Sequence, residues 1–234
     1  MQGLRWSFIA LLCACLDHSA GGIKGLAAAA ATKEPVAAFP LQISAWITIT
    51  AHMIEPESEY PPRERRIRIH YDYVGKRAKV NIEAGYEAAK FYIRRYDLDH
   101  EYMVRLPPIH DCKRSHLGEV MPYPEIPNAK FVREEVVNGT LCNYFLHQDF
   151  ETRVHLYFRV SDNAPIKLIQ ESTEDDVSTP LLTYEFSDIA LGDPLVTSND
   201  PTLYDLPRPF EHGTCTNHVG GFPYMHIFHY FVRI

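Results

Sequence analysis

Strict alternation of apolar and polar residues between positions 41 and 53 limits most strongly what this chain can fold into. The apolar positions fall on every second residue, namely Leu41, Ile43, Ala45, Ile47, Ile49, Ala51 and Met53. Because successive side chains of an extended strand point to opposite faces, this pattern predicts a long strand with one buried face.

The same period of two recurs along the chain. Residues 67–73 alternate, turn at Gly75-Lys76 and continue into residues 80–84, which predicts a hairpin. The cleanest alternation covers residues 153–160. Further strands are predicted at residues 91–96, 102–106, 131–137, 141–146, 165–170 and 182–186. Since short polar turns separate these stretches, we expect antiparallel neighbours in meander order.

One apolar face per strand leaves a sheet that needs a cover on one side. A second sheet, the curvature of the sheet itself, a helix or a ligand would provide it. Residues 85–94 and 193–205 are the stretches that favour short helices. The sequence therefore predicts a mainly β protein, with a curved antiparallel sheet or half-open barrel and one or two short helices.

The N-terminus resembles a secretory signal peptide. Arg5 precedes an apolar run over residues 6–16, which has the length of a signal-peptide core and is too short to span a bilayer. We predict a signal peptide at residues 1–21, a flexible Ala/Pro-rich lead at 22–38 and a single β-rich domain at 39–234. An uncleaved anchor or an organelle transit peptide remains the alternative. No transmembrane segment is predicted after the signal, and the expected location is outside the cell or in the lumen of the secretory pathway.

The composition and net charge of the chain exclude some classes of protein and of binding partner. An apolar content of 46% excludes a disordered chain. The formal net charge is −7 and no stripe of Lys and Arg interrupts it, whereas a nucleic-acid binder needs a concentrated basic face. We therefore expect no nucleic-acid partner.

The cysteines and one sequon fit an oxidising compartment. A chain without its signal keeps Cys112, Cys142 and Cys215, and these allow three pairings. We favour a Cys112–Cys142 disulfide, which closes a loop of about thirty residues and stabilises by about 3 to 4 kcal/mol. Cys215 is then free or bonded to another chain. Asn138 begins an Asn-Gly-Thr sequon in a turn, which predicts glycosylation.

Residues that could carry chemistry do not form a specific pattern. On a strand, His226 and His229 point to opposite faces, so a buried terminal strand explains them better than a metal site. Cys215 lies near His218 in the sequence, but such pairs are frequent by chance. A salt bridge across a hairpin turn explains Asp72 and Arg77. We predict no catalytic residue, no metal site, no cofactor and no enzymatic activity.

Several short motifs follow one another along the chain. They are His70-Tyr71-Asp72-Tyr73 with Arg77, Cys112-Lys113, residues 135–144, the strand from Arg153, Pro165-Ile166-Lys167 and Tyr184-Glu185-Phe186. In this order they resemble a eukaryotic family of secreted proteins with a LolA-like domain. A similar module stands at the N-terminus of some papain-type proteases such as the counting-factor-associated protease. The resemblance spans residues 39–194. It implies a half-open barrel whose concave apolar face is capped by helices, although this chain offers few capping helices.

The resemblance and the one-sided strands together lead to a function hypothesis. We expect a non-enzymatic binding protein that holds a lipid, an acyl chain or another apolar ligand on its curved sheet. The candidate lining residues are Ile43, Ile47, Ile69, Tyr71, Val154, Leu156, Phe158, Tyr184 and Phe186. A closed core made by the same residues is equally compatible with the pattern. The second hypothesis is a protein-interaction or protease-associated module without a small-molecule ligand, and an enzyme using Cys215, His218 or Asp72 is the third.

Overall fold

The computed structural model describes residues 34–57, 63–82, 90–149, 152–173 and 178–222. The chain divides into a unit of residues Met1–Lys33 and a unit of residues Glu34–Ile234. The first unit, and with it the predicted signal peptide, lies outside the described residues. The predicted domain boundaries therefore stay predictions, and the described strands and helices all belong to the second unit.

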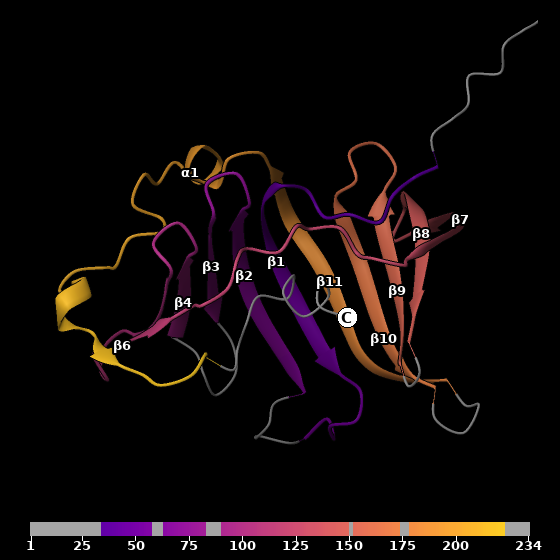
Figure 1. Ribbon diagram of the computed structural model, residues 1–234. Coiled ribbons are helices and arrows are strands. Elements are labelled where there is room, and N and C mark those ends of the chain that lie inside the picture. The colour runs from indigo at the N-terminus through magenta and orange to yellow at the C-terminus, as the bar shows by residue number, and fades with distance from the viewer. Residues whose placement is uncertain (1–33, 58–62, 83–89, 150–151, 174–177, 223–234) are drawn as a thin grey trace, which may run out of the picture. The chain divides into compact units, whose positions relative to one another are not determined.

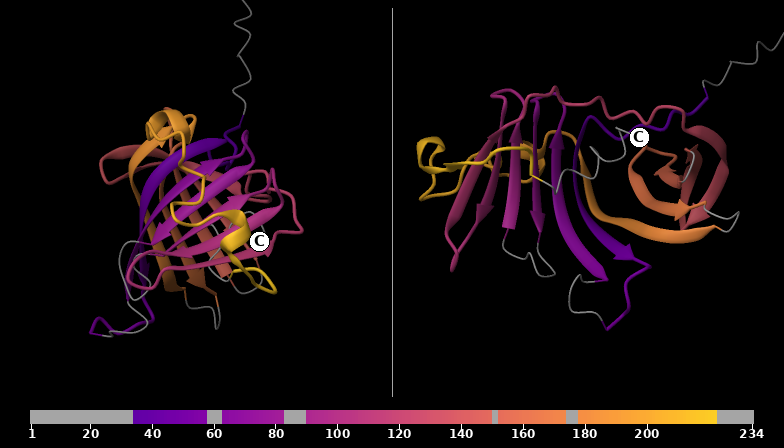
Figure 2. Two further views of the ribbon diagram at one scale, coloured as in Figure 1. Left: turned by 90° about the vertical axis from the view of Figure 1, so that its left-hand side faces the viewer. Right: turned by 60° about the horizontal axis from the view of Figure 1, so that its bottom comes forward.

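The second unit is built on one open, curved sheet of twelve strands. Figure 1 shows these strands side by side, and the right-hand view of Figure 2 shows the later half of the sheet curling round. The strands are β1 (Gln42–Ala51), β2 (Glu64–Asp72), β3 (Arg77–Ile82), β4 (Lys90–Arg95), β5 (His100–Arg105), β6 (Asp111–His116), β7 (Lys130–Val137), β8 (Thr140–Gln148), β9 (Thr152–Arg159), β10 (Pro165–Ser172), β11 (Thr179–Leu191) and β12 (Thr216–Asn217).

The strand order consists of two meanders that meet in the middle. It reads β12-β6-β5-β4-β3-β2-β1-β11-β10-β9-β8-β7. The first meander consists of β1 to β6 and the second of β7 to β11, and the two join where β1 pairs antiparallel with β11. β6 and β7 are consecutive in sequence but lie near opposite edges of the sheet. The connection at residues 117–129, here called the strap, therefore crosses from one half of the sheet to the other (Figure 1).

The predicted fold class is confirmed, with differences in three elements. The helix predicted at 193–205 is present as the single turn α1 (Pro194–Thr197). The Asp193 side chain caps its N-terminus by accepting from the Leu195 N–H at 2.9 Å. Within the other predicted helix, the described residues belong to strand β4. Cys112, which falls outside the predicted strands, lies in β6.

Two apolar clusters occupy opposite faces of the sheet. The larger cluster lies on the concave face, where β1, β2, β3 and β8 to β11 contribute their inward residues. The smaller one lies on the outer face of β4, β5 and β6, beneath residues 192–222, here called the arm. The arm contains α1, the 3-10 turn η2 (His212–Thr214) and β12, and it follows β11 back across the first meander. Each face of the sheet thus has its own irregular cover, although Phe222 at the end of the arm belongs to the concave cluster.

Candidate functional site

All nine residues predicted to line a ligand site lie in the concave cluster. Cross-strand pairing explains this, because Ile47 stands opposite Phe186 and Leu156 opposite Leu168, and paired side chains point to the same face. Each of the nine is at most 8% exposed. The structure therefore brings Ile43, Ile47, Ile69, Tyr71, Val154, Leu156, Phe158, Tyr184 and Phe186 together on one continuous apolar surface.

Among the described residues, two irregular segments cover most of this surface. Phe222, the last described residue of the arm, covers its edge over β4, with its ring 6.0 Å from that of Tyr92. Residues 34–41, which lead into β1, place Phe39 at 2% exposure with its ring edge-on to Phe158 at a centroid distance of 5.3 Å. The strap contributes Met121 and Ile126, which are 5% and 4% exposed. Neither segment shows strand alternation in the sequence, so the sequence offered no signal that they complete the apolar cluster.

The two covering segments are bonded to one another. The Phe39 N–H donates to the Pro124 carbonyl at 2.7 Å, and the Ile126 N–H donates to the Ala37 carbonyl at 2.9 Å. Together with the isolated bridge between Ala38 and Glu125, these bonds make a short antiparallel pair outside the main sheet. The two segments form one cover, and that cover is not part of the twelve-stranded ladder.

Side chains of the sheet anchor this cover at separate points. The Tyr71 hydroxyl donates to the Pro122 carbonyl at 2.9 Å, and burial raises the pKa of Tyr71 well above its ordinary value. Tyr73 packs edge-on against Tyr123 at 5.4 Å. At the start of the strap, Glu119 accepts from Arg94 at 3.0 Å. The cover is thus attached by individual contacts rather than by a continuous run of backbone hydrogen bonds.

Arg94 belongs to a buried polar cluster at the strap's first end. Its Nε lies 2.8 Å from Glu101 Oε2, and both side chains are 3% exposed. The second Glu101 oxygen accepts from the Phe222 N–H at 2.7 Å. Burial alone would lower the pKa of Arg94, but Tyr96, Glu101 and Glu119 together raise it. Because this guanidinium is already neutralised, it acts as a structural anchor.

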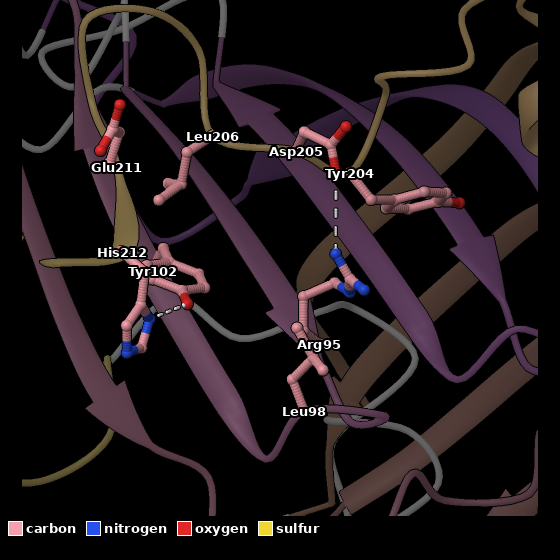
Figure 3. A pocket seen from close by; sticks show the side chains of 8 residues that line it. All are labelled: Arg95, Leu98, Tyr102, Tyr204, Asp205, Leu206, Glu211 and His212. Atoms are coloured by element: carbon pink, nitrogen blue, oxygen red, sulfur yellow. Dashed lines mark hydrogen bonds and ion pairs between the residues drawn. The ribbon is translucent and has the colours of Figure 1, made fainter.

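A pocket of about 300 Å³ opens on the outer face, between the arm and β4 and β5 (Figure 3). The Tyr102 hydroxyl and His212 Nδ1 are 2.6 Å apart, and Arg95 pairs with Asp97 at 2.7 Å and with Asp205 at 3.7 Å. The lining residues are Arg95, Leu98, Tyr102, Tyr204, Asp205, Leu206, Glu211 and His212. Arg95 is already paired with two carboxylates, and the lining contains no Ser, Thr or Cys side chain. We therefore interpret this pocket as the margin between the arm and the sheet.

The predicted Cys112–Cys142 disulfide is wrong. Cys112 bonds instead to Cys215, with Cα atoms 4.7 Å apart. β12 of the arm pairs in parallel with β6, which places Cys215 next to Cys112. Cys142 lies on β8, in the other meander, and its buried thiol donates to the Thr140 carbonyl at 3.4 Å. Burial raises the pKa of this thiol.

The residues considered for catalysis are occupied by structural contacts. Cys215 has no free thiol, and the His218 ring stacks on Phe222 at 4.8 Å. Asp72 accepts from Arg77 at 2.9 Å as predicted, although Asp72 itself is only 1% exposed. His226 and His229 lie outside the described residues. Within the described part of the chain, no three His, Cys, Asp or Glu side chains group as metal ligands.

Comparisons with known proteins give no family assignment. No protein-family model and no curated protein sequence matches this chain. Solved structures of similar architecture include an uncharacterized conserved protein from Thermus thermophilus, with 8% identity and a TM-score of 0.49 over 75% of this chain and 89% of that one. A chain of the Pseudomonas aeruginosa MucA/MucB complex is 10% identical with a TM-score of 0.42, over 65% of this chain and about half (53%) of that one.

A LolA superfamily protein from Nitrosomonas europaea is 13% identical, with a TM-score of 0.30 over 68% of this chain and 88% of that one. A LolA-like architecture is thus found among the similar structures, while a eukaryotic origin and a link to protease-associated modules stay predictions. All three TM-scores lie below 0.5, so they carry no conclusion about what this chain binds.

The sequon at Asn138 lies at an exposed hairpin tip. Asn138 and Gly139 join β7 to β8 with φ angles of +50° and +76°, a backbone geometry that favours Asn-Gly in two-residue turns. The Asn138 side chain is exposed. The turn would present this side chain to a glycosylating enzyme, and glycosylation itself stays a prediction.

Among the described residues, no helix is long and apolar enough to cross a membrane.

Proposed function

We propose that this protein is a non-enzymatic binding protein that holds an apolar ligand, a lipid or an acyl chain, between the concave face of its sheet and the strap. One observation carries the proposal. The predicted lining residues form a single apolar surface, and the cover over that surface is a separate pair of irregular segments attached to the sheet at individual points. The concave cluster therefore has a wall with its own hydrogen-bonded ladder and a cover outside that ladder, and a ligand could enter by displacing the cover.

The energetics allow the cover to exchange for a ligand. Lifting Phe39, Met121 and Ile126 from the sheet would expose apolar area at a cost of about 25 cal/mol per Å². A bound alkyl chain recovers about 0.8 kcal/mol for each CH₂ group that it buries. Because the sheet keeps its own ladder when the cover moves, the binding surface persists in the open form. The described structure is then the closed form.

Secretion belongs to the same proposal. The signal peptide at residues 1–21 and the glycan at Asn138 remain predictions, and the Cys112–Cys215 disulfide is of the kind that forms in oxidising compartments. An extracellular or luminal carrier meets membranes and free lipids directly. No nucleic-acid partner is expected, because the chain carries a formal charge of −7.

Native mass spectrometry of the secreted protein, followed by organic extraction, tests this function. We expect a bound lipid, a cleaved N-terminus, a glycan mass at Asn138 and a mass deficit of one disulfide. Incubation with phosphatidylcholine vesicles that contain free fatty acid and fatty alcohol then shows whether a stripped sample takes up lipid. A protein that leaves secretion bare and stays bare in the vesicles would contradict the proposal.

The β7 edge of the sheet, which pairs with no further strand among the described residues, favours a second candidate, a protein-interaction module. β7 is the last strand in the order, and its exposed side chains include Val132 and Val136, at 43% and 68% exposure. An edge strand can pair with an extended segment of another protein. A Val136→Lys variant should then lose a partner that the wild type recovers, a cysteine protease being the expected class, while lipid uptake is unchanged. Equal recovery by both proteins would argue against this surface.

A further inference from the structure

The concave face carries a buried polar side chain at one end of its apolar surface. His147 is 4% exposed and lies on β8, two residues beyond the fully buried Phe145. It stands opposite Val154 of β9, which is 1% exposed and belongs to the concave cluster. Because cross-strand partners share a face, the His147 side chain is on the same face as the predicted lining residues.

Its position is defined by successive rows across the sheet. Phe145, Leu156, Leu168 and Tyr184 form one apolar row over β8, β9, β10 and β11. The neighbouring row contains His147, Val154 and Gln170, and Gln170 is 6% exposed. The concave face therefore changes from wholly apolar to partly polar within one step along the strands. A ligand with an apolar chain and a polar end matches that change.

The hydrogen bonding of His147 defines what the polar end must supply. Nδ1 lies 3.0 Å from the carbonyl oxygen of Pro127 in the strap, and since a carbonyl can only accept, Nδ1 carries the hydrogen. Nε2 of the neutral ring is then an acceptor. This atom is buried and has no hydrogen-bond partner in the described part of the protein. A buried acceptor without a donor is costly, at about 1 to 3 kcal/mol, so such an atom calls for an explanation.

We propose that His147 Nε2 accepts a hydrogen bond from the hydroxyl group of a long-chain lipid, so that the site selects an amphipathic ligand with a donor at its polar end. This inference rests on the proposed function and adds the ligand class. The alkyl chain would lie over the row of Phe145, Leu156 and Leu168, and the hydroxyl would reach His147. A carboxylate offers only acceptors to a neutral imidazole and is disfavoured.

A matched pair of ligands tests the selection. 1-Hexadecanol and its methyl ether have the same chain and the same oxygen, but the ether has no donor. Competition of each against a fluorescent apolar dye gives the two affinities for the wild-type protein. We expect the alcohol to bind about three- to tenfold more tightly, the effect of one hydrogen bond. In a His147→Leu variant the alcohol should lose this advantage, while the ether binds as it does to wild type.

His155→Leu is the matched control, because His155 lies one residue beyond Val154 on the opposite face of β9, beside Tyr144. It should keep the preference for the alcohol. Equal affinities for alcohol and ether in the wild type, which require no variant to fold, would overturn the assignment of His147. So would palmitate binding more tightly than the alcohol. If neither neutral ligand nor palmitate displaces the dye and none is taken up from vesicles, the proposed function itself fails.

Discussion

The two apolar clusters of this protein differ mainly in how their covers are attached. On the outer face, the arm packs Leu203 and Tyr204 against β4 and β5 and is fixed by the Cys112–Cys215 bond. Parallel pairing of β12 with β6 adds a backbone ladder to this cover. On the concave face, the strap and residues 34–41 pair with one another, and side chains such as Tyr71 tether them to the sheet.

This difference separates a structural face from a candidate binding face. A covalently fixed cover keeps its cluster permanently buried, so the outer cluster stabilises the first meander. A cover held by individual hydrogen bonds, each contributing about 0.5 to 1.5 kcal/mol, opens at a cost that a bound ligand can offset. The concave cluster is therefore the one whose burial is expected to depend on ligand.

Removing the disulfide should have the largest effect, and it should be confined to the arm side. A Cys112→Ala/Cys215→Ala variant loses a cross-link between residues 103 positions apart, which is expected to lower the free energy of unfolding by about 4 kcal/mol. Urea unfolding measures this loss. Relative to the wild type, hydrogen exchange in the variant should accelerate more in the arm than in the strap.

Cys142→Ala is the control for this prediction. Cys142 is buried and has a free thiol, so its replacement should leave the sensitivity of the protein to reductant unchanged. Peptide mapping without reduction that links Cys112 to Cys142 would contradict the pairing. Equal loosening of strap and arm in the double variant would remove the distinction between the two covers.

Acid should weaken the arm side next. His70 lies on the outer face, 3% exposed, with Nδ1 2.9 Å from Ser44 Oγ. Burial, together with Arg68 and Lys79, lowers the pKa of His70 to about 4 from its ordinary value of 6.5. Between these two values the unfolded chain binds the proton and the folded one does not, so stability falls as the pH falls.

We expect a loss of up to about 2 kcal/mol between pH 7.5 and pH 5 from His70. Urea unfolding at the two pH values measures it, and a His70→Gln variant should show a flatter dependence. Protonation is opposed by Arg68, on the same strand as His70, and by Lys79, opposite His70 on β3, whereas Asp200 of the arm favours it. A His70→Gln variant with the full wild-type slope would show that another group is responsible.

The strands could be predicted from the sequence because alternation reports burial directly. β9 shows this plainly, since Val154, Leu156 and Phe158 are all buried on one face, as the period of two predicts. The same reasoning places the nine lining residues on one surface. The alternation of apolar and polar residues indicates which face of a strand is buried, but it does not indicate which segment covers that face.

The sequence-based predictions failed where segments distant in the sequence determine whether a residue is buried. β6 has few apolar residues, and its Cys112 is buried because the arm, about a hundred residues later, covers it. The pairing of Cys112 with Cys215 follows from that contact and has no local signal. In β4, residues Lys90–Phe91–Tyr92–Ile93–Arg94 are buried on both faces, so alternation disappears and a helix is a plausible alternative. His147 continues the inward register of β8, but only the structure shows that its Nε2 has no partner among the described residues.

The smallest effect is expected from loosening the strap alone. A Tyr71→Phe variant removes the hydroxyl that donates to the Pro122 carbonyl and keeps the ring in the concave cluster. The free energy of unfolding should fall by about 1 kcal/mol. Hydrogen exchange of residues 117–129 should become faster and lipid uptake from vesicles should speed up, since the closed form is less favoured.

Tyr102→Phe is the matched control, because it removes a hydroxyl bonded to His212 beneath the arm. That variant should leave both strap exchange and lipid uptake unchanged. Faster uptake in Tyr102→Phe, or unchanged strap exchange in Tyr71→Phe, would mean that the strap is not the cover that opens, and the concave cluster would then be a closed core like the one beneath the arm.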